Sequence, residues 1–167
     1  IDAEVPSPAS FTVASATSLI KSAPIRSKRS RGLIFRATDT PSFVMVGDGT
    51  QKDQLLALER SLGIEESISH RYVTYEEMPR MYQIADIFVA PSIPIFTFEE
   101  QYCIALLEAQ SCGLPIVTTK TGSIPENIGS AGLLVRPKDS IELASAIKRF
   151  IRSPQLRCSY AKKARLR

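Results

Sequence analysis

The sequence is poor in the residues that bind metals or form redox centres. It contains three cysteines, Cys103, Cys112 and Cys158, with no CxxC spacing, and a single histidine, His70. A structural zinc site needs about four such ligands, so we predict no metal site. The cysteines are expected to be reduced thiols, of which one or two are buried. His70 is expected to be a surface or packing residue and not a catalytic base.

Long apolar runs are also missing. No stretch approaches the roughly 18 apolar residues that span a bilayer, and the N-terminal residues lack the charged and apolar segments of a signal peptide. We therefore expect a cytoplasmic protein. The chain opens with Ile1 and closes at Arg167 without a helix stop signal, so both ends are expected to be cut from a longer chain. With 167 residues, 44% of them hydrophobic, it can form the core of one globular domain.

Acidic residues are absent after Glu142, and the charge of the last segment is therefore strongly positive. Its basic residues are Lys148, Arg149, Arg152, Arg157, Lys162, Lys163, Arg165 and Arg167, and an earlier basic cluster comprises Arg26, Lys28, Arg29, Arg31 and Arg36. Such runs are usually solvated faces, and the open alternative is contact with an anionic membrane at its cytoplasmic face. Neither run is regularly interleaved with aromatic side chains that stack on bases, so we expect no nucleic-acid partner.

The chain divides near Thr40. Residues 1–40 are rich in Ser, Ala, Pro and Arg, and we expect an irregular, truncated part of a domain there. Residues 41–167 alternate apolar runs with amphipathic segments, which predict strands at 43–46, 86–90, 116–119 and 132–135 and helices at 55–62, 76–84, 100–111, 140–151 and from 154. This alternation is typical of an α/β fold, a doubly wound parallel sheet of the Rossmann-like kind in a single domain.

Ligands of such sheets bind beyond the carboxyl ends of the strands, where helix N-termini present free amide groups. Two segments match this description in the sequence. One is the turn Gly47-Asp48-Gly49 after the first predicted strand, and the other is the loop 91–100 that leads into the helix predicted at 100–111. Most Gly-Asp-Gly turns merely reverse the chain, so the second segment is the more informative.

Two glutamates mark that helix as a candidate site. Glu100 and Glu108 are eight residues apart, which places them on neighbouring faces of one helix, about 12 Å apart along its axis. Glu100 would lie at the helix start, where the dipole favours a negative charge. Glu108 lies among apolar neighbours, and a buried carboxylate is costly unless it is hydrogen-bonded. Hydroxyl groups of a ligand would supply those bonds; the alternative is that Glu100 is a cap and Glu108 a solvated residue.

The segment PSIPIFTFEEQYCIALLEAQSCGLP (residues 91–115) resembles the E-x7-E signature of the family 4 glycosyltransferases, which are retaining enzymes of the two-domain GT-B fold. FVMVGDG (43–49), EEMPRMYQIADIFVAPS (76–92) and AGLLVRPKDSIELASAI (131–147) resemble further motifs of that family, in its order. The resemblance covers nearly all of residues 43–167. It implies the C-terminal, nucleotide-sugar-binding domain of a glycosyltransferase.

The resemblance also implies roles for individual residues. Glu108 matches the glutamate that binds the ribose hydroxyls, and Glu100 matches the catalytic glutamate that contacts the transferred sugar. The backbone amides in the first helical turn would face the diphosphate of a UDP- or GDP-linked sugar, with no bound metal and no further cofactor. The full set of expected donor contacts is Glu108, Tyr102, Cys103, Ile104, Gly47 and Gly49.

The sequence departs from the family at several of its phosphate-binding positions. Ala14-Ser15 stand where the family has Lys-Gly, and no residue matches its phosphate-binding Arg. Cys103 replaces the glycine that follows the aromatic residue of the signature, and the loop 67–73 lacks a family glycine. The acceptor-binding N-terminal domain is also missing, so we expect the isolated chain to bind donor at most. The alternative is a degenerate, non-catalytic relative that binds a nucleotide sugar, a partner protein or a membrane.

Overall fold

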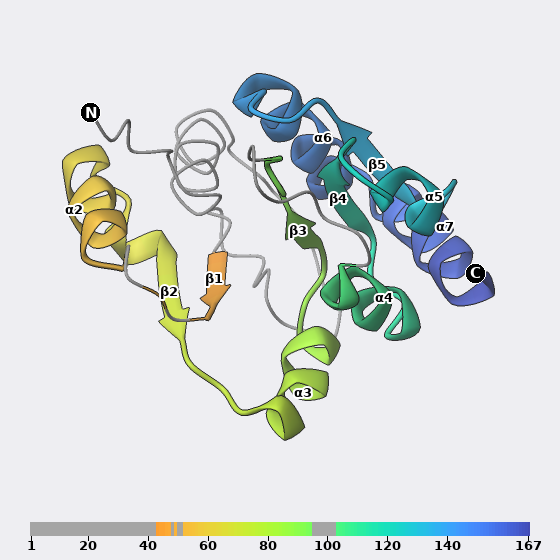
Figure 1. The fold of residues 1–167 in the computed structure, drawn as a ribbon, viewed down its shortest axis with the longest axis horizontal. Helices are drawn as coiled ribbons and strands as arrows, with labels where there is room; N and C mark the ends of the chain where they lie inside the picture. Colours follow the sequence, from red (N-terminus) through yellow and green to blue (C-terminus); the bar gives the residue numbers. More distant parts are fainter. Residues whose placement is uncertain (1–42, 48, 50–51, 95–102) are drawn as a thin grey trace.

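The computed structural model describes residues 43–47, 49, 52–94 and 103–167. Within these ranges the strands form two parallel sheets, one with the order β1-β2 and the other with the order β3-β4-β5 (Figure 1). The strands are β1 (Phe43–Val46), β2 (Ile68–Arg71), β3 (Phe88–Ala90), β4 (Ile116–Thr119) and β5 (Gly132–Val135). The segment expected to be irregular, 1–40, lies outside the described residues.

The first sheet forms a β-α-β unit. Helix α2 (Lys52–Leu62) connects β1 to β2, and it ends where Gly63 adopts a left-handed φ of 64°. Leu55 of α2 packs with two apolar residues near β2 to form a small core. A polar pair accompanies this core: Glu59 of α2 is 1% exposed, and its Oε1 lies 2.8 Å from Nε2 of His70 in β2. His70 is therefore a packing residue, as expected.

Helices cover both faces of the second sheet, which confirms the predicted doubly wound arrangement. Consecutive residues of a strand point to opposite faces, and the two residues that begin β4 separate accordingly. Val117 packs in a cluster with α6 (Ser140–Arg152), whereas Ile116 packs in another with residues of α3 (Met78–Gln83), α4 (Ile104–Ser111) and α5 (Ile124–Ile128). All four residues of β4 are buried, as a central strand requires.

The last two helices begin at the residues that the sequence indicated. Asp139 caps α6, and its side chain accepts a hydrogen bond of 2.8 Å from the amide of Glu142. Ser153 caps α7 (Pro154–Leu166) in the same way, with its hydroxyl 3.1 Å from the amide of Leu156. Pro154 takes the first helical position, where its missing N–H costs no hydrogen bond.

Helix α7 joins the two helical layers. It contacts both α6 and α4, and its Arg165 side chain lies against the Cα of Gly113, at the turn after α4. Arg167 donates hydrogen bonds to the carbonyls of Glu126 and Asn127 near the end of α5. These carbonyls have no partner within a helix of five residues, so the C-terminal arginine caps α5. None of the helices in the described ranges is long and apolar enough to cross a membrane.

Several elements differ from the sequence-based expectations. Strand β2 occupies a segment that was predicted to be a loop, and α5 occupies another. Strand β3 is shorter than predicted, because it begins at Phe88 and not at residue 86. The helix predicted at 76–84 is divided into a 3-10 turn, η2 (Tyr75–Glu77), and α3; a second 3-10 turn, η1 (Glu65–Ser67), precedes β2.

Candidate functional site

Helix α4 does not begin at Glu100, and the prediction of one helix over residues 100–111 is wrong at its start. Cys103 has φ 40° and ψ 68°, a left-handed conformation that an α-helix cannot contain, so the first helical residue is Ile104. Glu108 is therefore carried by a helix that begins at Ile104. Glu100 and Tyr102 themselves lie outside the described residues. Cys103 is the residue before the helix and Ile104 its first member, so the two still lie at the N-terminus of α4.

The N-terminus of α4 offers free amide groups. The amides of Ile104 and Ala105 have no hydrogen-bond partner among the residues that the structure describes, whereas the amide of Leu106 donates to the carbonyl of Cys103 at 2.8 Å. The Ile104 side chain is 65% exposed, so solvent reaches this end of the helix. Free amides and the positive end of the helix dipole together favour an anion such as phosphate.

Glu108 lies half-buried in the second turn of α4, and a tyrosine from another helix holds its carboxylate. The hydroxyl of Tyr82, in α3, donates a hydrogen bond of 2.8 Å to Oε2 of Glu108. The Tyr82 ring is 3% exposed and packs edge-on against Phe88, with 5.6 Å between ring centroids. Burial, and then the hydrogen bond and charge of Glu108, raise the pKa of Tyr82 far above its ordinary value. The protein thus supplies one of the hydrogen bonds that we expected a ligand to provide.

The second carboxylate oxygen of Glu108 is differently placed. Oε1 has no hydrogen-bond partner in the part of the chain that the structure describes. Leu107, the preceding residue, is 43% exposed, and the side chain of Glu108 itself is only half-buried. The site therefore combines one oxygen that is fixed by Tyr82 with one that can accept a hydrogen bond from a ligand hydroxyl.

The glycines of the Gly47-Asp48-Gly49 turn lie in open space. An added Cβ at Gly47 or at Gly49 would meet no atom within 4 Å. The amide of Gly47 donates to the carbonyl of Arg71 at 3.0 Å, which extends the pairing of β1 with β2, so this amide is not available to a ligand. Asp48 lies outside the described residues. A contact between the donor nucleotide and Gly47 or Gly49 stays a prediction. At Gly47 the nucleotide would lie in the open space beside the Cα, since the amide is already hydrogen-bonded.

Two buried threonines, whose role was not predicted from the sequence, organise the start of the loop that follows β3. The hydroxyl of Thr118 donates to the carbonyl of Ala90 at 2.7 Å, and that of Thr119 donates to the carbonyl of Ser92. Both threonines belong to β4 and are at most 2% exposed. They bind the backbone at the start of the loop that leads towards Glu100. Their signal in the sequence was a Thr-Thr pair at the end of a predicted buried strand.

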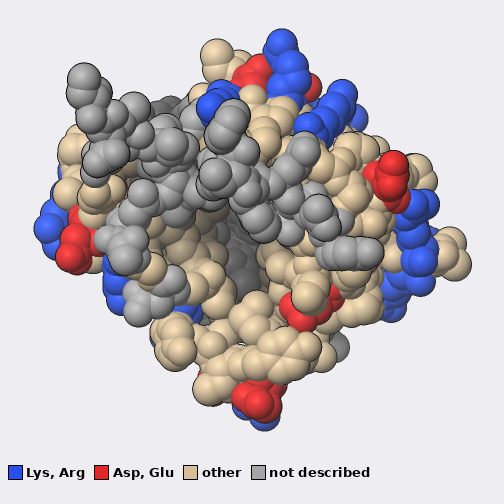
Figure 2. Space-filling view, viewed as in Figure 1, with Lys and Arg blue, Asp and Glu red and all other residues tan. Residues whose placement is uncertain are grey.

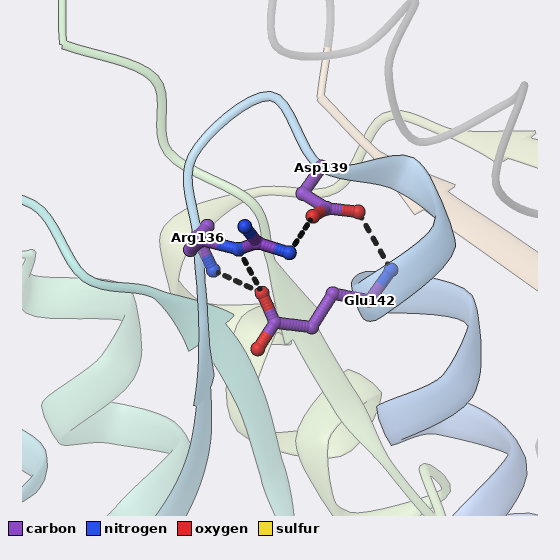
Figure 3. A network of polar contacts seen from close by, with 3 residues as sticks. All are labelled: Arg136, Asp139 and Glu142. Atoms are coloured by element: carbon purple, nitrogen blue, oxygen red, sulfur yellow. Dashed lines mark hydrogen bonds and ion pairs between the residues drawn. The ribbon is translucent and has the colours of Figure 1, made fainter.

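Two basic residues lie directly after β4 and β5, and they differ in their partners. Arg136 follows β5, and its side chain contacts Glu142 at 3.1 Å and Asp139 at 2.7 Å, while its amide donates to the same Glu142 oxygen (Figure 3). These bonds, the amide first, lower the pKa of Glu142. Lys120, after β4, is exposed and has no acidic partner within the described ranges. Lys120 is therefore one cation available to an anion at this edge of the sheet.

Charged side chains are unevenly distributed over the surface of the described residues. On the face seen in Figure 2, basic side chains lie mainly at the rim, whereas the described residues around a central hollow are mostly uncharged. The described residues contain no group of three or more His, Cys, Asp or Glu side chains that could hold a metal ion. Cys103 and Cys112 are half-buried thiols, and Cys158 is an exposed thiol.

Comparison with known proteins agrees with this architecture. Residues 17–167 match the family model of the glycosyl transferases group 1. A D-inositol 3-phosphate glycosyltransferase of Corynebacterium jeikeium is 33% identical over 114 residues, which cover 65% of this chain and 26% of the relative. The C-terminal domain of a glycosyl transferase group 1 family protein from Francisella tularensis superimposes with a TM-score of 0.73 at 22% identity, over 93% of this chain and 74% of that one.

A third similar protein was solved with ligands. Anabaena HepE, in complex with UDP and glucose, has a TM-score of 0.74 at 22% identity, and the match covers 98% of this chain and 41% of that one. The chain thus spans about a quarter of the curated relative and less than half of HepE. Its doubly wound fold is that of the C-terminal domains of GT-B glycosyltransferases. The family model matches residues 17–167, which is most of the chain, and the chain therefore belongs to the glycosyl transferases group 1 family.

Proposed function

We propose that this chain is the donor-binding half of a retaining glycosyltransferase that uses a UDP- or GDP-linked sugar. The observation that carries the proposal is the half-buried carboxylate of Glu108, with one oxygen held by Tyr82 and the other unpartnered among the described residues. A carboxylate accepts hydrogen bonds only, so its natural ligand is a group with hydroxyl donors. The ribose of a nucleotide presents two adjacent hydroxyls.

The diphosphate has a matching place at the start of α4. The amides of Ile104 and Ala105 and the helix dipole favour negative charge there. Glu108 lies one helical turn further along the same helix, and four residues of α-helix rise about 6 Å. That separation suits a nucleotide whose diphosphate lies at the helix N-terminus while its ribose contacts Glu108.

Transfer of the sugar needs stabilisation of the leaving nucleoside diphosphate, whose negative charge grows in the transition state. The helix N-terminus supplies part of this stabilisation, and Lys120 is the exposed cation nearest in sequence to the carboxyl end of β4. Glu100, by its family resemblance, would contact the transferred sugar, and Tyr102 would contribute an amide to the diphosphate. HepE, which shares the fold, was solved with UDP and glucose, which supports a nucleotide-sugar donor for this chain.

The acceptor is expected to bind to another part of the protein. The chain corresponds to about a quarter of its curated relative, and in a GT-B enzyme the reaction takes place in the cleft between two domains. We therefore propose that this chain binds donor, and that transfer with retention requires an acceptor-binding domain joined to it. By itself the chain is expected to bind the nucleotide weakly.

Titration of the chain with UDP, GDP and their sugars tests the proposal. We expect high-micromolar to millimolar dissociation constants for the diphosphates, and we expect Glu108→Ala to abolish this binding. Glu126→Ala is the matched control, because Glu126 is an exposed glutamate on another short helix, α5, and its substitution should leave binding unchanged. Equal binding by wild type and Glu108→Ala would remove Glu108 from the site and contradict the proposal.

A second proposal concerns the basic residues of α7. Lys162, Lys163 and Arg165 are exposed, and no acidic residue follows Glu142 in the sequence. We infer that this helix makes a peripheral contact with an anionic membrane. Vesicles that contain anionic lipid should bind the chain at low salt and release it at high salt, and Lys162→Gln combined with Lys163→Gln should weaken binding. Equal binding to neutral vesicles would contradict an electrostatic contact.

A further inference from the structure

The hydrogen bond between Tyr82 and Glu108 joins two helices that are far apart in the sequence. Tyr82 lies in α3 and Glu108 in α4, 26 residues later, and the bond is 2.8 Å long. We propose that Tyr82 is a positioning residue for the donor: it holds Oε2 of Glu108 so that Oε1 is presented to the ribose hydroxyls. This inference rests on the proposed function, because it assigns a second residue to the same site.

Tyr82 is rigid enough to serve this purpose. Its ring is 3% exposed and belongs to the apolar cluster that also contains Leu106 and Ile116. The edge-on contact with Phe88, 5.6 Å between centroids at an interplanar angle of 72°, restricts rotation of the ring. The position of the Tyr82 hydroxyl is therefore set by packing, and not by the carboxylate that it binds.

The carboxylate of Glu108 needs a partner that holds it in place. A glutamate side chain has three rotatable bonds and loses appreciable entropy when a ligand fixes it. The other hydrogen bonds near Glu108 involve its backbone carbonyl, which accepts from Ser111 Oγ and from the amide of Cys112, and they leave the carboxylate free to move. Tyr82 is the hydrogen-bond donor to that carboxylate within the described ranges. Because Tyr82 orders the carboxylate before the nucleotide binds, less entropy is lost on binding.

This role makes a specific prediction about the nucleotide. A positioned Glu108 improves hydrogen bonding to the ribose hydroxyls, and it does nothing for the base or the phosphates. Loss of the Tyr82 hydroxyl should therefore weaken binding of UDP and GDP, whereas binding of the 2′,3′-dideoxy diphosphates, which lack both ribose hydroxyls, should change little. A purely structural role for Tyr82 would weaken both kinds of nucleotide by the same factor.

The test compares Tyr82→Phe with Tyr160→Phe in the complete chain. Tyr160 also packs edge-on against a phenylalanine, Phe150, with 5.2 Å between centroids at 76°, so the control removes a hydroxyl from a similarly packed ring. NMR titrations with UDP, GDP and their 2′,3′-dideoxy forms give the ratio of ribose to dideoxyribose affinity. For Tyr82→Phe we expect the ribonucleotide affinity to fall about fivefold to tenfold, the effect of one hydrogen bond to a charged group at a partly open site. Tyr160→Phe should behave as wild type.

The outcomes separate the inference from the proposed function. If the wild-type chain binds neither UDP nor GDP, the proposed function fails and the inference falls with it. If Glu108→Ala loses nucleotide binding but Tyr82→Phe retains the wild-type preference for ribose in full, the proposed function stands and the inference is overturned. Equal losses for ribose and dideoxyribose nucleotides in Tyr82→Phe also overturn it. If the inference is correct, Tyr82→Phe lowers ribonucleotide affinity no more than Glu108→Ala does, because Tyr82 acts through the Glu108 carboxylate.

Discussion

Two carboxylates on different helices of this chain each have one side-chain partner, and they differ in what surrounds them. Glu59 of α2 is 1% exposed, and its Oε1 lies 2.8 Å from His70 of the neighbouring strand. Glu108 of α4 is half-buried, and its Oε2 lies 2.8 Å from the hydroxyl of Tyr82. The hydrogen bonds are equally short, but solvent reaches only the second carboxylate to an appreciable extent.

The difference shows that accessibility, and not pairing, separates a structural carboxylate from a candidate binding group. Glu59 lies where α2 packs on β2, and a ligand could reach it only if this unit opened. Glu108 keeps an oxygen without a partner in the described part of the chain, beside the half-exposed Leu107. Substitution should therefore affect chiefly stability at Glu59 and chiefly nucleotide binding at Glu108. The following predictions test this contrast.

The largest effect on stability is expected for Glu59→Ala. The substitution leaves the His70 ring without its partner and creates a cavity under α2, which should lower the free energy of unfolding by about 2 to 3 kcal/mol. Urea denaturation followed by circular dichroism measures the loss. Glu66→Ala, at an exposed glutamate nearby, should change it by less than about 0.5 kcal/mol. Equal stability of the two variants would contradict the structural role of the Glu59 carboxylate.

Alkaline titration should show the coupling of Tyr82 to Glu108. The pKa of Tyr82 is raised above the ordinary 10.0, so the folded state favours the protonated phenol. The stability that this contributes is fully present below pH 10.0 and is lost as the pH rises through the window above that value. Glu108→Ala removes a charge and a hydrogen bond but leaves the burial, so the pKa of Tyr82 should fall partway towards 10.0.

Tyrosinate absorbance measures this titration, and Tyr82→Phe identifies which part of the curve belongs to Tyr82. An unchanged titration in Glu108→Ala would mean that the hydrogen bond does not persist in solution. In that case the half-buried carboxylate would be a freely moving side chain, and the comparison with Glu59 would lose its basis.

A smaller loss of stability is expected for Glu108→Ala. Water can enter the space that the side chain leaves and can accept the hydrogen bond of Tyr82, so the free energy of unfolding should fall by about 1 kcal/mol. Glu108→Gln retains an acceptor for Tyr82 and should be closer to wild type in stability, yet its neutral amide should bind ribose more weakly than the carboxylate does. A stability loss in Glu108→Ala as large as that of Glu59→Ala would make both carboxylates structural.

The smallest effect is expected at Cys103. Its φ of 40° is unfavourable for a residue with a Cβ, so Cys103→Gly should raise the stability by about 0.5 to 1 kcal/mol. Lys138→Gly is the matched control, because Lys138 has a φ of 63° in the turn before α6. Both variants should be stabilised to a similar degree in thermal denaturation. Only Cys103→Gly should also change diphosphate affinity, since it alone lies at the N-terminus of α4.

The conformation of Cys103 gives a physical reason for the glycine that the family resemblance implies at this position. The family that the chain resembles has glycine at this position, and here the backbone adopts the left-handed conformation that glycine tolerates best. The sequence predicted a helix through this position because the segment 100–111 runs to a stop signal at Gly113. Periodicity does not report the dihedral angles of one residue, so the true start of α4 could not be predicted.

Local pattern was sufficient for the central elements. Strands β4 and β5 have the predicted bounds, and the helix predicted at 140–151 is α6, which buries Leu143, Ala144, Ile147 and Ile151. Their apolar runs and caps lie within a few residues of one another, so the signal is contained in a short segment. Strand β2 was missed because Ser69, His70 and Arg71 are polar, and they become a strand by pairing with β1.

The sequence alone thus determined most of the strands and helices, the parallel doubly wound arrangement and the family, because hydrophobic periodicity and linked motifs are properties of the chain itself. The tertiary structure decided the partners of the polar side chains. Glu59 meets His70 across 11 residues, and Tyr82 meets Glu108 across 26. Such contacts depend on how helices pack against strands, and no local pattern encodes the distance between side chains that only folding brings together.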